Sequence, residues 1–304
     1  MSAIWGYLSY TNTINEGISS SMEAPYREKC KLDRTRSQQL SKLYIGCGIQ
    51  HITKEAQQEV LPIFDTENGI HFTADCILDN REELLSLLNA DSSAPDGTLM
   101  YLAYKRWGID CLKKFRGMFS MAVYDANTQT LYLAADQVSS RCLYYHKTEE
   151  YVCFSTLLEP IRRICPEISL NEYYLKDFLT APGLMPNIVS TETPYTGVYK
   201  INPGCYMTIT QNNITEHSYW TPFTQKKHRH LTAKDYGKAF RELYNECVKD
   251  ALRTDGEVGI SMSSGLDSSS IGALAALQLR DEKKTLYSYT YVPYEAPKQD
   301  KRNK

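Results

Sequence analysis

The stretch that decides the fold is EVGISMSSGLDSSSIGALAALQ, residues 257–278. Its first part, 257–262, has the apolar character of a strand, and its last part, 268–278, is rich in alanine and leucine, as helices are. Small residues fill the turn between the two parts. A strand that leads into a helix through such a turn is where an open α/β sheet binds its ligands. We therefore expect residues 263–269 to form a loop that holds nucleotide phosphates.

The chemistry of this loop suits an anion. Small side chains let backbone N–H groups approach phosphate oxygens, and a helix N-terminus adds about half a positive charge. Serine hydroxyls can donate further hydrogen bonds, and the carboxylate of Asp267 is a ligand suited to Mg²⁺. No Walker lysine is present, so this is not a kinase-type P-loop. The predicted binding set is Met262, Ser263, Ser264, Gly265, Asp267, Ser268, Ser269 and Tyr291. The plain alternative is a serine-rich helix cap that follows a tight turn at Gly265.

The residues around the loop follow an α/β order. Apolar residues recur at helical spacing from 233 to 252, and Asp255–Gly256 ends that run. A second strand is predicted over 285–292, with Tyr291 near its end. Helix, strand, helix and strand in succession indicate the start of a parallel sheet.

Upstream of residue 224 the pattern is different. Apolar runs predict strands over 3–9, 43–52, 70–78, 118–124, 130–135, 151–155, 198–201, 205–210 and 214–219. Helical spacing predicts helices over 81–88, 97–107 and 171–179, the last of them broken by 182–186. We predict that the polar segment 12–39 is a surface loop. Many short strands with few helices indicate a layered α+β domain.

The polar, basic segment 224–230 marks the boundary between the two domains, which we place at 1–225 and 226–304. Its histidines, His228 and His230, could be taken for a metal pair. No other ligand lies nearby in the sequence, so solvated linker histidines are the better interpretation.

Composition excludes several classes of protein. The net charge of −2 offers no electrostatic footprint for nucleic acid or an anionic membrane. Nine cysteines are scattered without C-x-x-C spacing, which argues against a zinc site or a disulfide framework and favours a reducing, cytoplasmic setting. No signal peptide is evident, and no stretch approaches the ~20 apolar residues that a membrane span needs.

The run S-S-G-L-D-S-S resembles S-G-G-x-D-S, the pyrophosphate loop of the ATP pyrophosphatases. Together with Met262 and S-I-G-A-L at 270–274, it is similar to the asparagine synthetase family. The resemblance implies that the protein uses ATP and Mg²⁺ to activate a small carboxylate or peptide as an acyl-adenylate. An amine then attacks this adenylate. The resemblance is also compatible with a homodimer. Ser264 replaces the second glycine of the family loop. We expect its Cβ to crowd the phosphates or to strain a backbone with positive φ, and so to weaken binding.

The resemblance extends toward the N-terminus. Residues 96–125, from D-G-T-L-M-Y-L-A-Y to G-M-F-S-M-A-V-Y-D, look like the glutaminase domain of asparagine synthetases, as do 131–145, 154–162 and 198–220. This implies a four-layer αββα fold of the N-terminal-nucleophile type over 1–225, followed by the start of an α/β parallel-sheet ATP-pyrophosphatase domain.

The catalytic residues that this resemblance implies are mostly replaced. The family nucleophile is an N-terminal cysteine, and this chain has Ser2. The arginine that holds glutamine falls at Ile49, and the Asn-Gly pair of the oxyanion hole falls at Asp75–Cys76, where a carboxylate would repel a developing oxyanion. The family run R-D-x-x-G-x-x-P-L-Y has lost its arginine, glycine and proline over 135–144. Asp96, at the position that binds the glutamine amino group, persists. We expect a glutaminase-like scaffold that is inactive.

Three interpretations of the function of the whole chain remain open. Without glutaminase activity, the attacking amine could belong to the substrate, as in asparagine-synthetase-like cyclases that make lasso peptides or β-lactams; the opening M-S-A-I is similar to lasso peptide cyclases. The chain could instead be an asparagine synthase homologue that makes asparagine from aspartate, with glutamine or free ammonia as the nitrogen source. Because the family domain continues well past this length, a truncated, non-catalytic binding module is the third reading.

Overall fold

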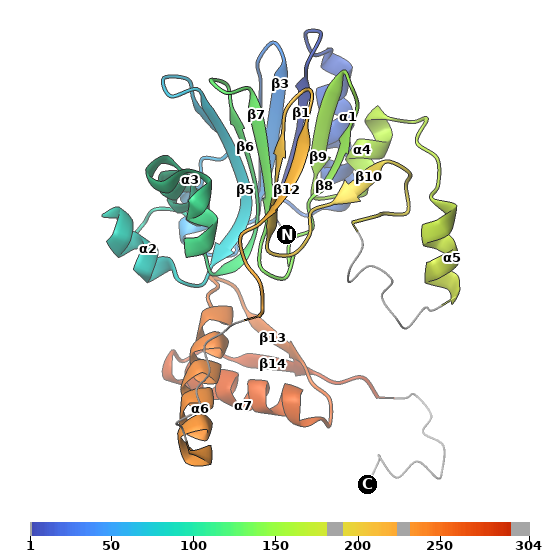
Figure 1. Ribbon diagram of the computed structural model, residues 1–304. Helices are drawn as coiled ribbons and strands as arrows, with labels where there is room; N and C mark the ends of the chain where they lie inside the picture. Colours follow the sequence, from blue (N-terminus) through green and yellow to red (C-terminus); the bar gives the residue numbers. More distant parts are fainter. Residues whose placement is uncertain (1, 181–190, 224–231, 293–304) are drawn as a thin grey trace. The chain divides into compact units, whose positions relative to one another are not determined.

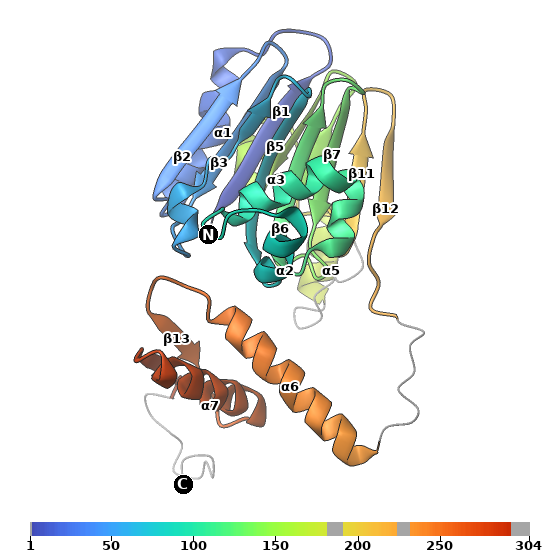
Figure 2. The same cartoon turned by 90° about the vertical axis from the view of Figure 1, so that its left-hand side faces the viewer.

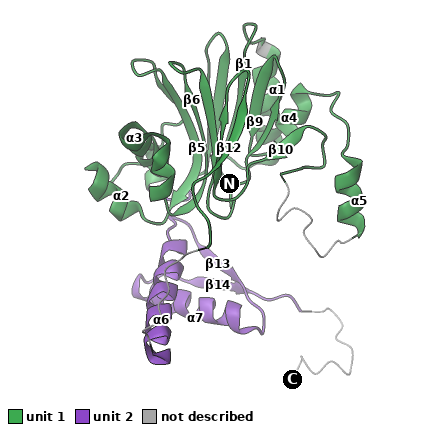
Figure 3. Ribbon diagram, viewed as in Figure 1, with its two compact units in different colours: residues 1–51, 55–225 green, residues 52–54, 226–304 purple. Residues whose placement is uncertain are grey.

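The computed structural model describes residues 2–180, 191–223 and 232–292, in two compact units (Figure 3). Unit 1 comprises 1–51 and 55–225, and unit 2 comprises 52–54 and 226–304. The predicted linker 224–230 with His228 and His230, the helix-breaking segment 182–186 and the end of the chain after 292 lie outside the described residues.

Unit 1 contains two six-stranded antiparallel sheets within the described residues (Figures 1 and 2). The first has the order β10-β8-β9-β1-β3-β2. Its strands are β1 (Ala3–Ser9), β2 (Arg34–Gln39), β3 (Leu43–Ile49), β8 (Tyr144–Lys147), β9 (Tyr151–Ser155) and β10 (Val198–Lys200). The second has the order β12-β11-β7-β6-β5-β4. Its strands are β4 (Ile63–Asp65), β5 (Ile70–Leu78), β6 (Gly117–Asp125), β7 (Thr130–Ala135), β11 (Cys205–Ile209) and β12 (Ile214–Ser218).

The main core lies between the two sheets. It joins buried residues of the first sheet, such as Ile4 and Ile45, to those of the second, such as Phe72 and Met121. Every residue of β1 and β3 is buried, which explains why these strands read as continuous apolar runs rather than alternating ones.

Helices cover the outer faces of both sheets (Figure 1). Helices α1 (Glu16–Lys29) and α4 (Leu158–Ile164) contribute to a second core on the first sheet, where Trp5 stacks on Tyr26 with ring centroids 4.4 Å apart. Helices α2 (Arg81–Leu88) and α3 (Asp96–Trp107) cover the second sheet, and α5 (Glu172–Thr180) follows later in the chain. Short 3₁₀ turns occupy Glu55–Gln58 and Gly108–Lys114. The layer order is helix, sheet, sheet, helix.

The structure corrects the prediction of a surface loop over 12–39, since α1 and β2 lie within it. Helix α1 contains Pro25 and a serine run, which obscure its helical spacing, yet Met22 and Tyr26 are fully buried one turn apart. Strand β2 is an edge strand of polar residues, so it lacks the apolar pattern by which strands are predicted.

Unit 2 has the predicted order of elements. These are α6 (Ala233–Ala251), β13 (Val258–Ser261), α7 (Leu266–Asp281) and β14 (Leu286–Tyr289). The two strands pair in parallel, with Val258 opposite Leu286, and α7 forms the crossover between them. No helix in the described part of the chain is long and apolar enough to cross a membrane.

Candidate functional site

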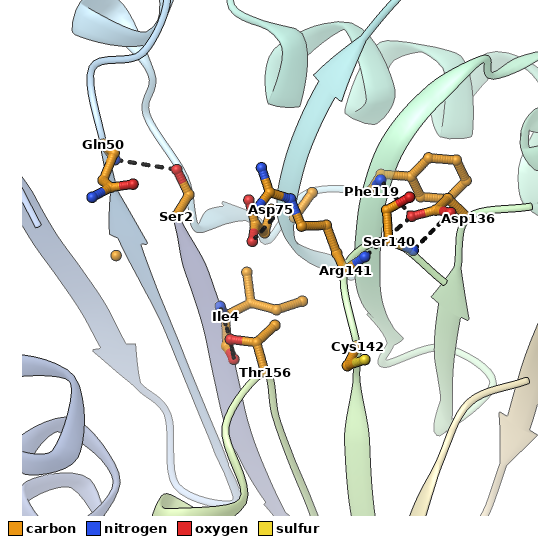
Figure 4. Close-up of polar contacts among 12 residues, drawn as sticks. Ser2, Ile4, Gln50, Asp75, Phe119, Asp136, Ser140, Arg141, Cys142 and Thr156 are labelled. Atoms are coloured by element: carbon orange, nitrogen blue, oxygen red, sulfur yellow. Dashed lines mark hydrogen bonds and ion pairs between the residues drawn. The ribbon is translucent and has the colours of Figure 1, made fainter. Parts of the chain in front are cut away.

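A cavity of about 180 Å³ lies beside Ser2 in unit 1 (Figure 4). Its walls include Ser2, Tyr26, Asp75, Arg141, Cys142 and Leu157. Ser2 directly precedes β1, and Gln50 directly follows the neighbouring strand β3. The Gln50 backbone N–H donates to the Ser2 Oγ at 3.1 Å, which fixes the hydroxyl oxygen at this end of the sheet.

Asp75 lies on the cavity wall next to an arginine that the sequence analysis did not single out. The Arg141 Nε is 3.8 Å from the Asp75 Oδ2, and the two side chains are 10% and 3% exposed. Figure 4 shows Arg141 extending toward Asp75. Burial raises the pKa of Asp75 to about 6, although the Arg141 charge acts in the opposite direction. The expected negative charge at this position is therefore partly neutralised by Arg141.

The loop that carries Arg141 and Cys142 is built around Asp136, which is 1% exposed. Its carboxylate accepts hydrogen bonds from the backbone N–H groups of Phe119, Val138, Ser140 and Arg141 at 3.0–3.3 Å. Ser139 adopts a positive φ of 54° in the same loop. The retained aspartate thus shapes a loop whose outer residues differ from the family run.

Asp96 has partners elsewhere in unit 1. Its Oδ1 accepts from the Arg81 Nη1 at 2.9 Å, and its Oδ2 accepts from the Leu78 N–H at 2.9 Å. Both residues of the ion pair are buried. Asp96 does not line the cavity beside Ser2, and its role as a glutamine ligand stays a prediction.

Ile49 is part of the apolar core, as its side chain predicts. Arg34 of β2 is its cross-strand partner, so an arginine does reach this region from the neighbouring strand. Arg34 donates to the Glu59 backbone oxygen, and its Nε is buried without a hydrogen-bond partner in the described part of the chain. Nothing in the sequence indicated this placement, because β2 was not predicted.

In unit 2, the first part of the predicted loop, Ser263 to Gly265, joins β13 to α7, whereas its last part, from Leu266 to Ser269, forms the first turn of α7 instead of a loop. The Ser263 N–H donates to the Ser268 Oγ at 3.0 Å, and the Gly265 N–H donates to the Ser263 Oγ at 3.2 Å. The Ser269 Oγ donates to the Gly265 carbonyl at 2.8 Å. These bonds hold the loop in a defined shape, and they also fit the helix-cap alternative.

At the start of α7, three backbone donors have no acceptor among the described residues. The first helical hydrogen bond runs from the Ser269 N–H to the Gly265 oxygen, so the N–H groups of Leu266, Asp267 and Ser268 have no acceptor within the helix. No side chain caps this end. The first residue of the helix, Leu266, is 87% exposed, so this end of α7 faces solvent. The helix start can therefore accept an anion.

The remaining residues of the predicted set differ in their placement. Ser264 is not among the described residues with positive φ, so the expected backbone strain is absent. The Met262 N–H donates to the Tyr289 oxygen at 2.8 Å and ties the loop to β14. Tyr291 is 93% exposed and has no hydrogen bond to the loop within the described residues. Asp267 is an exposed carboxylate, and the described residues hold no group of three potential metal ligands.

Comparisons with known proteins cover both units. A glutamine amidotransferase domain model matches residues 72–220, and an asparagine synthase model matches residues 239–302. Asparagine synthetase [glutamine-hydrolyzing] 3 of Bacillus subtilis is 28% identical over 225 residues, which cover 71% of this chain and 35% of that protein. Amidase chry2 of Gibberella zeae is 27% identical over 222 residues, covering 71% and 32%. The chain thus spans about a third of the length of these relatives.

Among solved structures, a glutamine phosphoribosylpyrophosphate amidotransferase from B. subtilis superposes with a TM-score of 0.53. The match covers 99% of this chain and 70% of that one. Because the identity is only 10%, the match supports the fold alone. The two family models match successive parts of the chain, one within each unit. The two domain matches and the curated relatives support the asparagine synthetase family as the family that this chain resembles.

Proposed function

We propose that this chain serves ATP-dependent amide-bond formation, in which a carboxylate is activated as an acyl-adenylate, pyrophosphate leaves and an amine attacks. The observation that carries the proposal is the start of α7, where three backbone N–H groups that follow a turn of small residues have no acceptor in the described part of the chain. This cradle suits the phosphates of ATP. The family match at 239–302, which includes the loop, supports the same chemistry.

Within this proposal, the loop residues bind the pyrophosphate portion of ATP. The N–H groups of Leu266, Asp267 and Ser268 donate to its oxygens, and Tyr291 is a further member of the nucleotide site. Mg²⁺ usually takes one or two carboxylates together with substrate phosphates, so Asp267 would hold it only along with a nucleotide. The ion would neutralise phosphate charge there.

The nitrogen in this proposal does not come from glutamine hydrolysis in unit 1. The cavity presents Ser2 in place of a thiol, and the Asp75 carboxylate lies where the resemblance implies the asparagine of the oxyanion hole. A substrate amine, as in lasso-peptide-type or β-lactam-type cyclisation, satisfies this condition. Free ammonia with aspartate as the acyl substrate, giving asparagine, is the alternative that a substrate screen distinguishes.

Binding of pyrophosphate and Mg·ATP to the purified chain, measured by isothermal titration calorimetry, tests the loop. Leu266→Pro removes one cradle N–H, while proline is well tolerated at the first helical position. Gly265, at φ −76° and ψ 155°, already has the backbone that a following proline requires. Leu266→Ala is the matched control, because it keeps the N–H and the side chain is exposed.

We expect Leu266→Pro to weaken pyrophosphate binding about tenfold or more, as loss of a hydrogen bond to a charged group does, and Leu266→Ala to leave it unchanged. Equal affinities of the two variants, or no pyrophosphate binding by the wild-type chain, would reject the loop as a phosphate site. Pyrophosphate release from ATP with aspartate plus ammonia, or with candidate peptides, then identifies the acyl substrate.

A further inference from the structure

Two buried cysteines meet where helix α4 packs on strand β9. Cys153 lies within β9, and Cys165 is the C-cap residue of α4, which runs beside that strand (Figure 1). Both side chains are 0% exposed, both thiols are free, and the two are in hydrogen-bond contact with each other. The fold thus brings two thiols from different elements to one point. Sulfurs that already touch have little distance to cover to reach the S–S bond length of about 2.05 Å.

The surroundings make the two sulfurs chemically different. The Tyr151 hydroxyl lies 2.9 Å from the Cys165 Sγ, and the Tyr151 ring is held by stacking on Tyr7 with ring centroids 4.9 Å apart. Hydrogen bonds from the Cys153 thiol and the Tyr151 hydroxyl lower the pKa of Cys165, although burial opposes them. Burial raises the pKa of Cys153 well above its ordinary value. The thiolate, which is the nucleophilic form, therefore belongs to Cys165.

We propose that Cys153 and Cys165 are a peroxide-sensitive thiol pair, in which a hydroperoxide oxidises Cys165 and Cys153 then closes a disulfide. In the first step the Cys165 sulfur attacks the terminal peroxide oxygen. An S–O bond forms, the O–O bond breaks, and the displaced oxygen leaves with the thiol proton as an alcohol, or as water when the oxidant is hydrogen peroxide.

In the second step the Cys153 sulfur attacks the sulfur of the Cys165 sulfenic acid. The S–S bond forms, the S–O bond breaks, and the hydroxyl leaves as water with the Cys153 proton. Two thiols and one hydroperoxide thus give one disulfide, one alcohol and one water. In a reducing compartment such a bond is transient and reports the presence of the oxidant.

The position of the pair connects its oxidation to the cavity in unit 1. The bond ties the end of α4 to β9, and this helix starts directly after Thr156 and Leu157, which line the cavity beside Ser2. Because the bond restrains α4, we expect its amides to exchange with deuterium about tenfold more slowly in the oxidised chain than in the reduced one.

Peptide mass spectrometry of the wild-type chain tests the proposal. The reduced chain is first treated with iodoacetamide, which blocks the exposed Cys142 and Cys247 and so prevents bonds between molecules. It is then exposed to hydrogen peroxide, quenched with catalase, unfolded and labelled with N-ethylmaleimide. Trypsin cleaves after Arg162 and Arg163, so the two cysteines of the pair fall in different peptides. We expect these peptides to be joined, lighter by two hydrogens than their sum, and to separate in dithiothreitol.

Matched controls come from the chain itself. Cys47 and Cys111 are 1% and 0% exposed, and burial raises the pKa of each. They should lose maleimide label at least about tenfold more slowly than the pair does at the same peroxide dose. In Cys153→Ser, the sulfenic acid of Cys165 lacks a thiol to react with, so dimedone should trap it. In Cys165→Ser, Cys153 should remain a free thiol.

Retention of the maleimide label on both Cys153 and Cys165 would overturn the proposal, as would its loss from Cys47 and Cys111 at the same dose. Dimedone labelling of Cys153 in Cys165→Ser would overturn the assignment of Cys165 as the attacking sulfur. The wild-type experiment decides whether the disulfide forms without relying on the folding of any variant. No nucleotide enters these reactions, so their outcome is independent of the function proposed for the loop in unit 2.

Discussion

Ser2 shows at the scale of a single residue why restoring a nucleophile is not enough. Ile49 and Asp75–Cys76 occupy the positions at which the family resemblance implies a substrate-binding arginine and the Asn-Gly pair of the oxyanion hole. Each missing oxyanion donor costs about 10²–10³ in rate. We therefore predict that Ser2→Cys releases no more glutamate from glutamine than the wild-type chain does, in a coupled glutamate dehydrogenase assay. A gain of 100-fold or more in Ser2→Cys would contradict this prediction.

Glu59 is a buried acid whose titration should affect stability. It is 6% exposed and accepts hydrogen bonds from the Gly97 and Val60 N–H groups at 2.9 and 3.1 Å. Burial nonetheless raises its pKa from 4.5 to about 7. Because the folded state holds the proton more tightly than the unfolded one, this group stabilises the protein most below pH 4.5, and that contribution is lost as the pH rises to 7.

We expect the unfolding free energy of the wild type, relative to Glu59→Gln, to fall by up to about 3 kcal/mol between pH 4.5 and pH 8, at 1.36 kcal/mol per pKa unit. Urea unfolding at a series of pH values measures this difference. Glu82→Gln, which changes an exposed glutamate of α2, is the control and should show no such trend. A pH-independent difference for Glu59→Gln would show that Glu59 does not titrate in this range.

Among the helices, α6 begins with a reciprocal cap. The Thr232 Oγ1 accepts from the Asp235 N–H at 3.3 Å, and the Asp235 carboxylate accepts from the Thr232 N–H at 3.0 Å. We predict that Thr232→Ala destabilises the first turn by about 1 kcal/mol, so its amides exchange about fivefold faster with deuterium. Lys234→Ala, which leaves both capping bonds in place, should change this exchange little. Equal exchange in the two variants would argue against the cap.

Sequence patterns identified the elements whose periodicity was strong. Strands β1 and β5 and helix α2 begin and end at the predicted residues, because their apolar runs are clear and bounded by polar ones. Elements whose stability comes from tertiary packing were missed. Helix α1 relies on burial against the first sheet, β2 is a polar edge strand, and β8 spans four residues with little apolar pattern.

In the candidate sites, too, features set by neighbouring residues could be predicted and features set by long-range packing could not. A short contiguous motif such as 263–269 carries its geometry in neighbouring residues, so its place at the junction of β13 and α7 could be predicted. Arg141 and Arg34 reach their positions through strand register and through a loop shaped by Asp136. Such long-range placement leaves no local signal in the sequence, and both arginines were missed.

For the molecule as a whole, the two units differ in how much apolar surface they bury. Unit 1 has two extensive cores, whereas in the described helices of unit 2 the buried residues are Val248, Gly272, Ala275 and Leu279. Phe240 and Leu243 of α6 are 66% and 60% exposed. We predict that amides of α6 and α7 exchange at least tenfold faster than those of β5 and β6 in hydrogen–deuterium exchange. Comparable protection in both units would contradict this.

The location of the tryptophans, among them the buried Trp5 that stacks on Tyr26, allows the two units to be followed separately. The three tryptophans of the chain are Trp5, Trp107 and Trp220, and all of them belong to unit 1. Their emission is therefore an optical label for unit 1 alone, whereas the far-ultraviolet helical signal contains the helices of both units, α6 and α7 among them. When the chain is heated, a partial loss of helical signal that precedes the tryptophan red shift would let a spectrometer resolve the two melting events without any added dye.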